Sequence, residues 1–193
     1  MKYLRYAYRI LWWQFNRLFF AQLGKRSYFQ KGILVTPKYI YCGKQVRVGR
    51  NCRIEGVARY NNISFQPQIL IKENVSIQQN LHLTCASKIE IGKNTAIAAN
   101  VTITDIHHPY VDINIPIEKQ NIETKEVKIG EDCKIYNNSV ILPGTTIGKH
   151  CTIGANSVVS GNIPDYSVAV GSPAKAIKHY NFETKQWEKT NQT

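Results

Sequence analysis

The sequence predicts an all-β solenoid, and three observations support that prediction. An aliphatic residue recurs at every sixth position across residues 129–159. A small residue lies four positions after each of the first five aliphatic residues: Cys133, Ser139, Thr145, Cys151 and Ser157. A period of six is neither the 3.6 of a helix nor the 2 of a strand, so it indicates an internal repeat.

Each hexad predicts one short strand and one tight turn, so three hexads close a triangular coil with its aliphatic residues inside and its small residues at the corners. Stacked coils then bury a continuous aliphatic column. Gly130, Gly148, Gly154 and Asn137 are expected where the turns need unusual backbone angles. The alternative, a β-sandwich with regular turns, does not explain a strict period held over five hexads.

Length and composition predict one domain with appendages, because the chain has 193 residues and 43% of them are hydrophobic. The formal net charge of +12 implies an anionic partner, which is a nucleic acid, a membrane surface, or a phosphorylated or acidic ligand. The five cysteines form neither a CxxC motif nor a zinc spacing, so no metal is expected: they stand at positions 42, 52, 85, 133 and 151. We expect core thiols, which suit a reducing cytosol.

Residues 1–31 are expected to form a basic aromatic segment, with an amphipathic helix that ends near Gly24. The segment has no acidic residue and seven basic ones: Lys2, Arg5, Arg9, Arg17, Lys25, Arg26 and Lys31. Two interpretations stay open and are compatible: the helix covers the open end of the first coil, or residues 1–24 bind an anionic membrane surface. No nucleic-acid-binding motif is present, so a nucleic acid is not the expected partner.

The arginines interrupt the apolar stretch of this helix, which is therefore too short and too charged to span a bilayer. No signal peptide is visible. These features predict a cytoplasmic protein, with peripheral attachment at the inner face of the cytoplasmic membrane as the further expectation.

Residues 32–178 are expected to form the solenoid, irregular up to residue 70 and regular beyond it. The repeat breaks between Ile103 and Ile129, which are 26 positions apart. This break predicts an excursion loop at about residues 105–127, and rigid scaffolds often carry their chemistry on such loops. Residues 171–173 (Gly-Ser-Pro) are expected to turn the chain after the last coil, and residues 179–193 to pack outside as a short helix or strand.

Two of the five histidines, His107 and His108, stand where the repeat breaks. Imidazole is the usual general base near neutral pH. Neighbouring side chains on an extended segment point to opposite sides, so at most one of the two is expected to act directly. His150 falls in a predicted solvent-facing turn and His179 in the tail, where neither has an obvious role.

The hexads, the run at residues 97–109 that ends in His-His-Pro, and the Val-Gly-Ser-Pro-Ala-Lys sequence at residues 170–175 resemble the hexapeptide-repeat acyltransferases. The nearest branch is that of the maltose and galactoside O-acetyltransferases and their surface-polysaccharide O-acetyltransferase relatives. The resemblance covers about residues 70–178 and implies a left-handed parallel β-helix that forms homotrimers. It also implies acetyl transfer from acetyl-CoA to a sugar hydroxyl in a cell-surface polysaccharide or its lipid-linked precursor.

Carried over by position, the resemblance makes His108, directly before Pro109, the general base. Asp105 and His107 are the expected supporting side chains, with Asp105 or a main-chain carbonyl group orienting the imidazole. The matching acetyl-CoA contacts are Asn137, Ala155, Ser160, Gly161, Lys175 and Lys178. The matching acceptor contacts are Gln78, Asn80, His82 and Tyr110.

The chain departs from the family pattern at two coenzyme positions. Lys134 stands where the family often has tryptophan, and Gly161 stands where it often has lysine. Four other functions remain open. They are N-acetylation of a nucleotide-linked amino sugar, acetylation of a drug, a γ-type zinc carbonic anhydrase whose three histidines would be His82, His107 and His108, and a non-catalytic β-helix scaffold.

Overall fold

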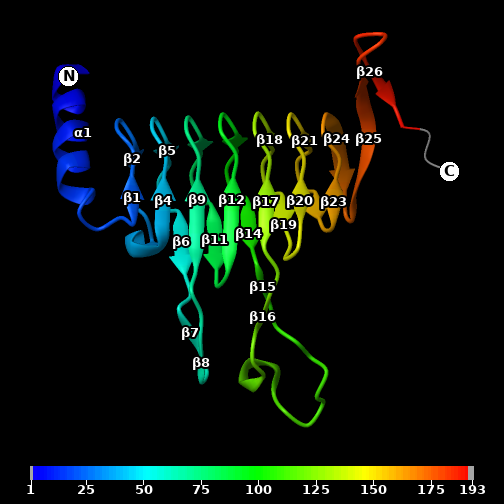
Figure 1. Ribbon diagram of the computed structural model, residues 1–193, viewed down its shortest axis with the longest axis horizontal. Coiled ribbons are helices and arrows are strands. Elements are labelled where there is room, and N and C mark those ends of the chain that lie inside the picture. Colours follow the sequence, from blue (N-terminus) through cyan, green and yellow to red (C-terminus); the bar gives the residue numbers. More distant parts are fainter. Residues whose placement is uncertain (1, 191–193) are drawn as a thin grey trace.

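The computed structural model describes residues 2–190, with side chains from residue 7 onward, and shows a three-sided parallel β-helix (Figure 1). Sheet A has seven strands: β1 (Gln22–Leu23), β4 (Ile40–Cys42), β9 (Gln68–Ile71), β12 (Lys88–Ile91), β17 (Val127–Ile129), β20 (Thr146–Ile147) and β23 (Asn162–Ile163). Sheet C has six: β3 (Leu34–Val35), β6 (Arg53–Gly56), β11 (His82–Cys85), β14 (Thr102–Thr104), β19 (Val140–Ile141) and β22 (Val158–Val159).

Sheet B completes the triangle with nine strands: β2 (Tyr28–Phe29), β5 (Arg47–Val48), β10 (Ser76–Ile77), β13 (Ala96–Ile97), β18 (Lys134–Ile135), β21 (Thr152–Ile153), β24 (Ser167–Gly171), β25 (Ala174–Asn181) and β26 (Gln186–Lys189). Each coil runs from sheet A through sheet B to sheet C. The connection between the last two sheets is called here the B–C corner, and the connection to the next coil the C–A corner. A 3₁₀ turn, η1 (Pro37–Tyr39), forms the C–A corner of the first coil.

The aliphatic column predicted from the hexads is present. Ile77, Ile97, Ile135 and Ile153 stand in register on neighbouring strands of sheet B, and none is more than 3% exposed. The small residues at the corners are also buried: Cys133, Ser139, Thr145, Cys151 and Ser157. All five cysteines of the chain are buried free thiols.

The predicted reason for the glycines was wrong. The positive φ angles fall two positions later, at Asp132, His150 and Asn156. Gly130 is required instead by the spacing between coils, because a Cβ atom there would lie 2.5 Å from the carbonyl oxygen of Gly148. Asn137 also lacks the positive φ, which belongs to the next residue.

Asparagines stack along the B–C corner. Asn80, Asn100, Asn138 and Asn156 have φ angles of 58–62°, a conformation that asparagine tolerates better than most residues. Their side-chain amides form a ladder, with N–O distances of 2.9, 3.1 and 3.0 Å between successive coils. The ladder fixes the spacing between successive coils at this corner.

Helix α1 (Lys2–Asn16) covers the first coil at one end of the molecule (Figure 1). The Trp12 ring stacks on Phe29 at 6.2 Å, and the Trp13 indole donates a hydrogen bond of 2.9 Å to the carbonyl oxygen of Gly24. The helix stops well before the expected Gly24, because Phe20 and Leu23 turn into the core. The first coil accordingly begins at residue 22 rather than 32.

Two segments leave the C–A corner on the same side of the molecule (Figure 1). The first is a hairpin of β7 (Arg59–Tyr60) and β8 (Ile63–Ser64), which the sequence analysis did not predict. The second is the excursion loop, whose stem pairs β15 (Ile106–His107) with β16 (Glu123–Thr124) and which contains the 3₁₀ turn η2 (Ile117–Lys119).

At the other end, β25 turns back along β24 and pairs with β26, so the tail extends sheet B as an antiparallel hairpin. The expected boundary after residue 178 falls inside β25. Residues 191–193 of the expected tail lie outside the described residues. Among residues 2–190, no helix combines the length and the apolar character that crossing a membrane requires.

Candidate functional site

His108 lies at the C–A corner of the fourth coil, immediately after the stem of the excursion loop. The stem pairs Ile106 with Thr124 and His107 with Glu123. Below it, Thr84 donates a hydrogen bond of 2.9 Å to the Thr104 hydroxyl oxygen, which accepts the backbone N–H of Ile106 at 3.1 Å. His108 is half-buried and His107 is exposed.

Tyr60 connects the short hairpin to this histidine and to the excursion loop. Its ring meets the His108 imidazole edge-on, with the centroids 5.4 Å apart and an interplanar angle of 80°. Its hydroxyl lies 2.8 Å from the Glu118 carboxylate and 2.9 Å from the Glu118 carbonyl oxygen. The hydrogen bond to Glu118 raises the pKa of Tyr60, with desolvation and the carboxylate charge adding to it.

Asn61 also binds the hairpin to the excursion loop, because its side-chain amide donates hydrogen bonds to the carbonyl oxygens of Glu118 at 3.4 Å and Gln120 at 3.3 Å. Sequence reasoning missed Tyr60, Asn61 and Glu118. The available signal was the Asn61–Asn62 pair between two short strand-like stretches, since asparagine tolerates the left-handed backbone conformation that hairpin turns use. Nothing in the sequence indicates that the hairpin tip reaches a loop 58 residues away.

Asp105 does not contact His108. Its carboxylate is fully buried and accepts the backbone N–H groups of Ala86 and Ser87, both at 2.8 Å. Its charge, together with burial as the larger cause, raises the pKa of the Cys85 thiol 3.3 Å away. Asp105 therefore fixes the turn between sheets C and A in the preceding coil, and it is not the orienting partner expected for the imidazole.

The Nδ1 atom of His108 is buried and has no hydrogen-bond partner among the described residues. A buried ring nitrogen of this kind usually has a partner that sets the tautomer. Within this chain neither Asp105 nor a main-chain carbonyl supplies it. The other ring nitrogen, Nε2, remains the atom able to exchange a proton with a bound molecule.

The residues matched to acetyl-CoA lie at three places near the C-terminal end of the β-helix. Asn137 and Ala155 lie at the B–C corner, on the exposed side of the asparagine ladder. Ser160 and Gly161 lie at the C–A corner, where Gly161 has a φ of +74° and open space around its α-carbon. The remaining two, Lys175 and Lys178, are exposed on β25.

The residues matched to the acceptor are likewise separated from His108 within one chain. Gln78 and Asn80 lie at the B–C corner, before β11, and His82 begins that strand. His108 follows β14, which runs parallel to β11 with His82 beside Thr102, so it lies beyond the opposite end of these strands. Of this set only Tyr110 is near the imidazoles, with its ring 6.0 Å from that of His107.

No three His, Cys, Asp or Glu side chains come together as a possible metal site within the described part of the chain. The carbonic anhydrase alternative requires His82. This residue lies at the start of the sheet C strands, whereas His107 and His108 lie beyond the opposite ends of these strands. One chain therefore does not assemble the three-histidine ligand set of a zinc site.

Comparison with known proteins agrees with this architecture. Residues 126–161 match the bacterial transferase hexapeptide (six repeats) family. The chain is 37% identical over 164 residues to WbbJ of Escherichia coli K12, named as a lipopolysaccharide biosynthesis O-acetyl transferase, and the match covers 81% of this chain and 83% of the relative. It is 29% identical over 180 residues to the galactoside O-acetyltransferase of the same strain, covering 93% and 80%.

A solved structure of a galactoside acetyltransferase in complex with coenzyme A superimposes with a TM-score of 0.59 at 25% identity, covering 92% of this chain and 74% of that one. The coils of the present chain are left-handed, as this similarity implies. The chain belongs to the hexapeptide-repeat acyltransferases.

Proposed function

We propose that the protein transfers the acetyl group of acetyl-CoA to a hydroxyl of a sugar in a cell-surface polysaccharide or its lipid-linked precursor. The observation on which this depends is the half-buried imidazole of His108, held by the loop stem and the Tyr60 ring directly before Pro109. The similarity to WbbJ favours a surface glycan as the acceptor.

The chemistry needs no covalent enzyme intermediate, because a thioester is already activated. Unprotonated Nε2 of His108 takes the proton of the acceptor hydroxyl while the oxygen attacks the thioester carbonyl. The tetrahedral intermediate then collapses, the carbon–sulfur bond breaks, and the imidazolium returns its proton to the departing thiolate. General-base catalysis of this kind contributes about 10²–10⁴ in rate.

The donor is proposed to lie along the C-terminal coils, with its phosphates near Lys175 and Lys178. The remaining donor residues occupy both corners that flank sheet C, namely Asn137 and Ala155 at one and Ser160 and Gly161 at the other. A single bound molecule can reach both sets if the C–A corner of one chain faces the B–C corner of another. This supports a homotrimer whose sites lie at the boundaries between chains.

The acceptor is proposed to bind across the same boundary. Gln78, Asn80 and His82 of one chain would contact the sugar, and His108 and Tyr110 of the neighbour would face its reacting hydroxyl. The reaction is placed in the cytoplasm at the inner membrane face, where a lipid-linked precursor is accessible. The basic aromatic N-terminal segment supports that location.

The test is release of the coenzyme A thiol when the purified protein is offered acetyl-CoA with candidate glycans. His108→Ala should lower the rate by about 10²–10⁴, whereas His179→Ala, a histidine exposed on β25, should not. Thermal unfolding should be the same for both variants. A folded His108→Ala protein with the full rate would refute the assignment of the base, and transfer to amino sugars alone would favour N-acetylation.

A further inference from the structure

The whole formal net charge of the protein lies at one end of the molecule. Residues 1–54 contain 12 lysines and arginines and no acidic residue, whereas residues 55–193 contain 13 basic and 13 acidic residues. The first group builds α1 and the first two coils, which form the N-terminal end of the β-helix (Figure 1). The two ends of this elongated molecule therefore present very different electrostatic surfaces.

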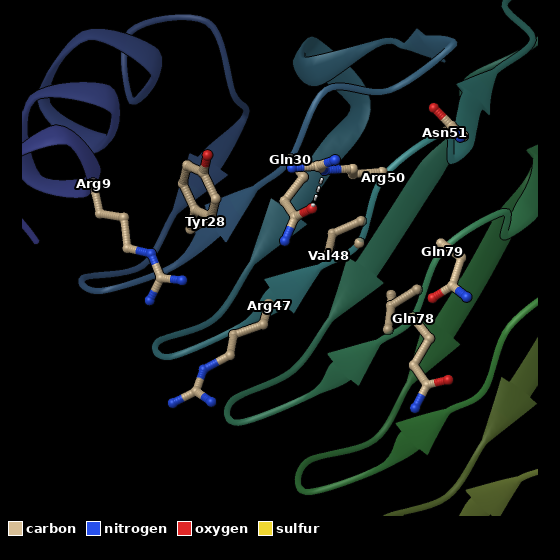
Figure 2. Close-up of a pocket in the computed structure, with 11 residues that line it drawn as sticks. Arg9, Tyr28, Gln30, Arg47, Val48, Arg50, Asn51, Gln78 and Gln79 are labelled. Carbon is tan, nitrogen blue, oxygen red and sulfur yellow. Dashed lines mark hydrogen bonds between the residues drawn. The ribbon is translucent and has the colours of Figure 1, made fainter. Parts of the chain in front are cut away.

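A pocket of about 420 Å³ opens at this basic end between α1 and the first three coils (Figure 2). Its polar lining includes Arg9 of α1, Tyr28 and Gln30 of the first coil, Arg47 and Arg50 of the second, and Gln78 of the third. A neighbouring hollow shares several of these residues and adds Tyr8 and Lys31. None of the residues that line either space is acidic.

Two of the three arginines of this pocket, Arg9 and Arg50, are positioned by neutral groups. The Arg9 guanidinium lies over the Tyr28 ring, 5.3 Å from its centroid, and Arg50 Nε donates a hydrogen bond of 3.2 Å to Gln30 Oε1 (Figure 2). Arg47 is the register partner of Tyr28 on the next strand. No salt bridge among the described residues involves Arg9, Arg47 or Arg50, so no described acidic side chain compensates their three charges.

Such an arrangement selects a compact anion with several oxygens. A guanidinium group presents a planar fork of donors that fits phosphate oxygens, and binding costs less when the fork is already positioned. The amide of Gln30 supplies a further donor at the same pocket, whereas Gln78 is assigned above to the acceptor. Phosphate is therefore the chemistry that best fits the pocket.

The surface beside the pocket indicates where that phosphate comes from. Leu11 and Phe15 of α1 are 64% and 65% exposed, on the side of the helix away from the coils. A helix that exposes aromatic and aliphatic residues next to arginines is suited to the boundary between lipid headgroups and acyl chains. We propose that the pocket binds the phosphate of a membrane lipid while the exposed face of α1 enters the interface. This site does not depend on which reaction His108 catalyses.

Flotation of the full-length protein with lipid vesicles tests the proposal. The protein should float with vesicles that contain phosphatidylglycerol and remain in solution with phosphatidylcholine alone. Arg47→Gln combined with Arg50→Gln should weaken binding at least tenfold relative to Lys38→Gln combined with Lys44→Gln. Both double variants remove two positive charges from the basic end, but neither Lys38 nor Lys44 lines the pocket.

General surface charge alone would lower vesicle affinity by about fivefold for each basic residue removed, wherever it stands near the membrane. Equal losses in the two double variants would therefore refute a specific pocket. Failure of the wild-type protein to bind phosphatidylglycerol vesicles would refute lipid binding as a whole.

A second experiment asks whether the bound phosphate belongs to a membrane lipid or to a soluble molecule. It is a thermal-shift titration with sn-glycerol 3-phosphate as the probe. The probe should stabilise the wild-type protein and the variant Leu11→Ser/Phe15→Ser, but not Arg47→Gln/Arg50→Gln. The Leu11→Ser/Phe15→Ser variant should nevertheless bind phosphatidylglycerol vesicles more weakly. If it binds vesicles as well as the wild type, the pocket serves a soluble phosphate and the lipid assignment is wrong.

Discussion

Asp105 has a buried carboxylate whose partners lie in the preceding coil. Replacing it with asparagine keeps one acceptor oxygen but turns an NH₂ group towards the N–H of Ala86 or Ser87. We expect Asp105→Asn to lower the free energy of unfolding by about 1–3 kcal/mol, the usual cost of an unsatisfied buried polar group. Chemical denaturation measures this. Unchanged stability with a large loss of activity would instead indicate that Asp105 acts on His108.

Tyr60→Phe separates the two contacts of the tyrosine, because phenylalanine keeps the ring beside His108 and loses the hydroxyl that meets Glu118. We expect the excursion loop to be cut faster by protease and acetyl transfer to slow by a few-fold, with thermal stability preserved. Tyr41→Phe is the matched control, since Tyr41 is exposed on β4 and has no role in the proposed site. If protease cuts the wild-type and Tyr60→Phe loops equally fast, the hydrogen bond between Tyr60 and Glu118 does not hold the loop in place.

The same hydrogen bond predicts a dependence on pH. The pKa of Tyr60 is raised in the folded protein by its hydrogen bond to Glu118. The stability that this hydrogen bond gives to the excursion loop is therefore fully present below the ordinary tyrosine pKa of about 10. The contribution disappears as the pH rises through the raised folded value, because the phenolate repels the carboxylate. The difference in protease sensitivity between the wild type and Tyr60→Phe should therefore vanish in strong alkali. If the difference in protease sensitivity stays constant as the pH rises into strong alkali, the Tyr60–Glu118 hydrogen bond is not its cause.

At the scale of elements, the excursion loop exposes alternate apolar side chains. Val111, Ile113, Ile115 and Ile117 are 85%, 93%, 44% and 50% exposed. A run of large apolar residues in water is typical of a surface that another chain covers. In the proposed homotrimer, Val111→Ser combined with Ile113→Ser should remove about 1.5–3 kcal/mol of association free energy per side chain.

Sedimentation velocity over a range of protein concentrations measures this change. The double loop variant should dissociate at concentrations where the wild type remains trimeric. Ile63→Ser, in the exposed hairpin, is the control for a simple change in surface polarity. A wild-type protein that is monomeric throughout would refute the homotrimer, and with it the shared site.

The elements that the sequence predicted well are those whose structure is determined by a local repeat. Strands from β17 to β22 follow directly from the hexads, because each inward residue is specified by its own period. The end of α1 and the β7–β8 hairpin were not predicted, since both depend on contacts between distant parts of the chain. Phe20 continues the apolar spacing of the helix, and only its place in the core of the first coil shows why the helix has already ended.

The site shows the same division. The break in the repeat singled out His107 and His108, and the family resemblance selected His108 because it precedes Pro109; its role as the base stays a prediction. The assignment of Asp105 as its partner failed because the groups that bind the carboxylate are backbone N–H groups, which every residue but proline carries and no sequence pattern reveals.

At the scale of the whole molecule, the proposed catalytic and acceptor residues occupy opposite ends of the strands of sheet C. A rigid β-helix cannot fold these ends together, so a working site needs the C–A corner of one chain against the B–C corner of another. This geometry predicts that two inactive proteins can restore each other. His108→Ala trimers keep intact acceptor residues, and Gln78→Ala trimers keep an intact base.

Equal amounts of the two variants should be dissociated, mixed and reassembled together. Random assembly would pair an intact base with an intact acceptor region at about a quarter of the boundaries, because each boundary draws one corner from each of two chains. Coenzyme A release should therefore recover to about a quarter of the wild-type rate, whereas either variant reassembled alone should stay inactive. If exchange of chains is shown by mass but no activity returns, base and acceptor residues must act within one chain, and the shared site is wrong.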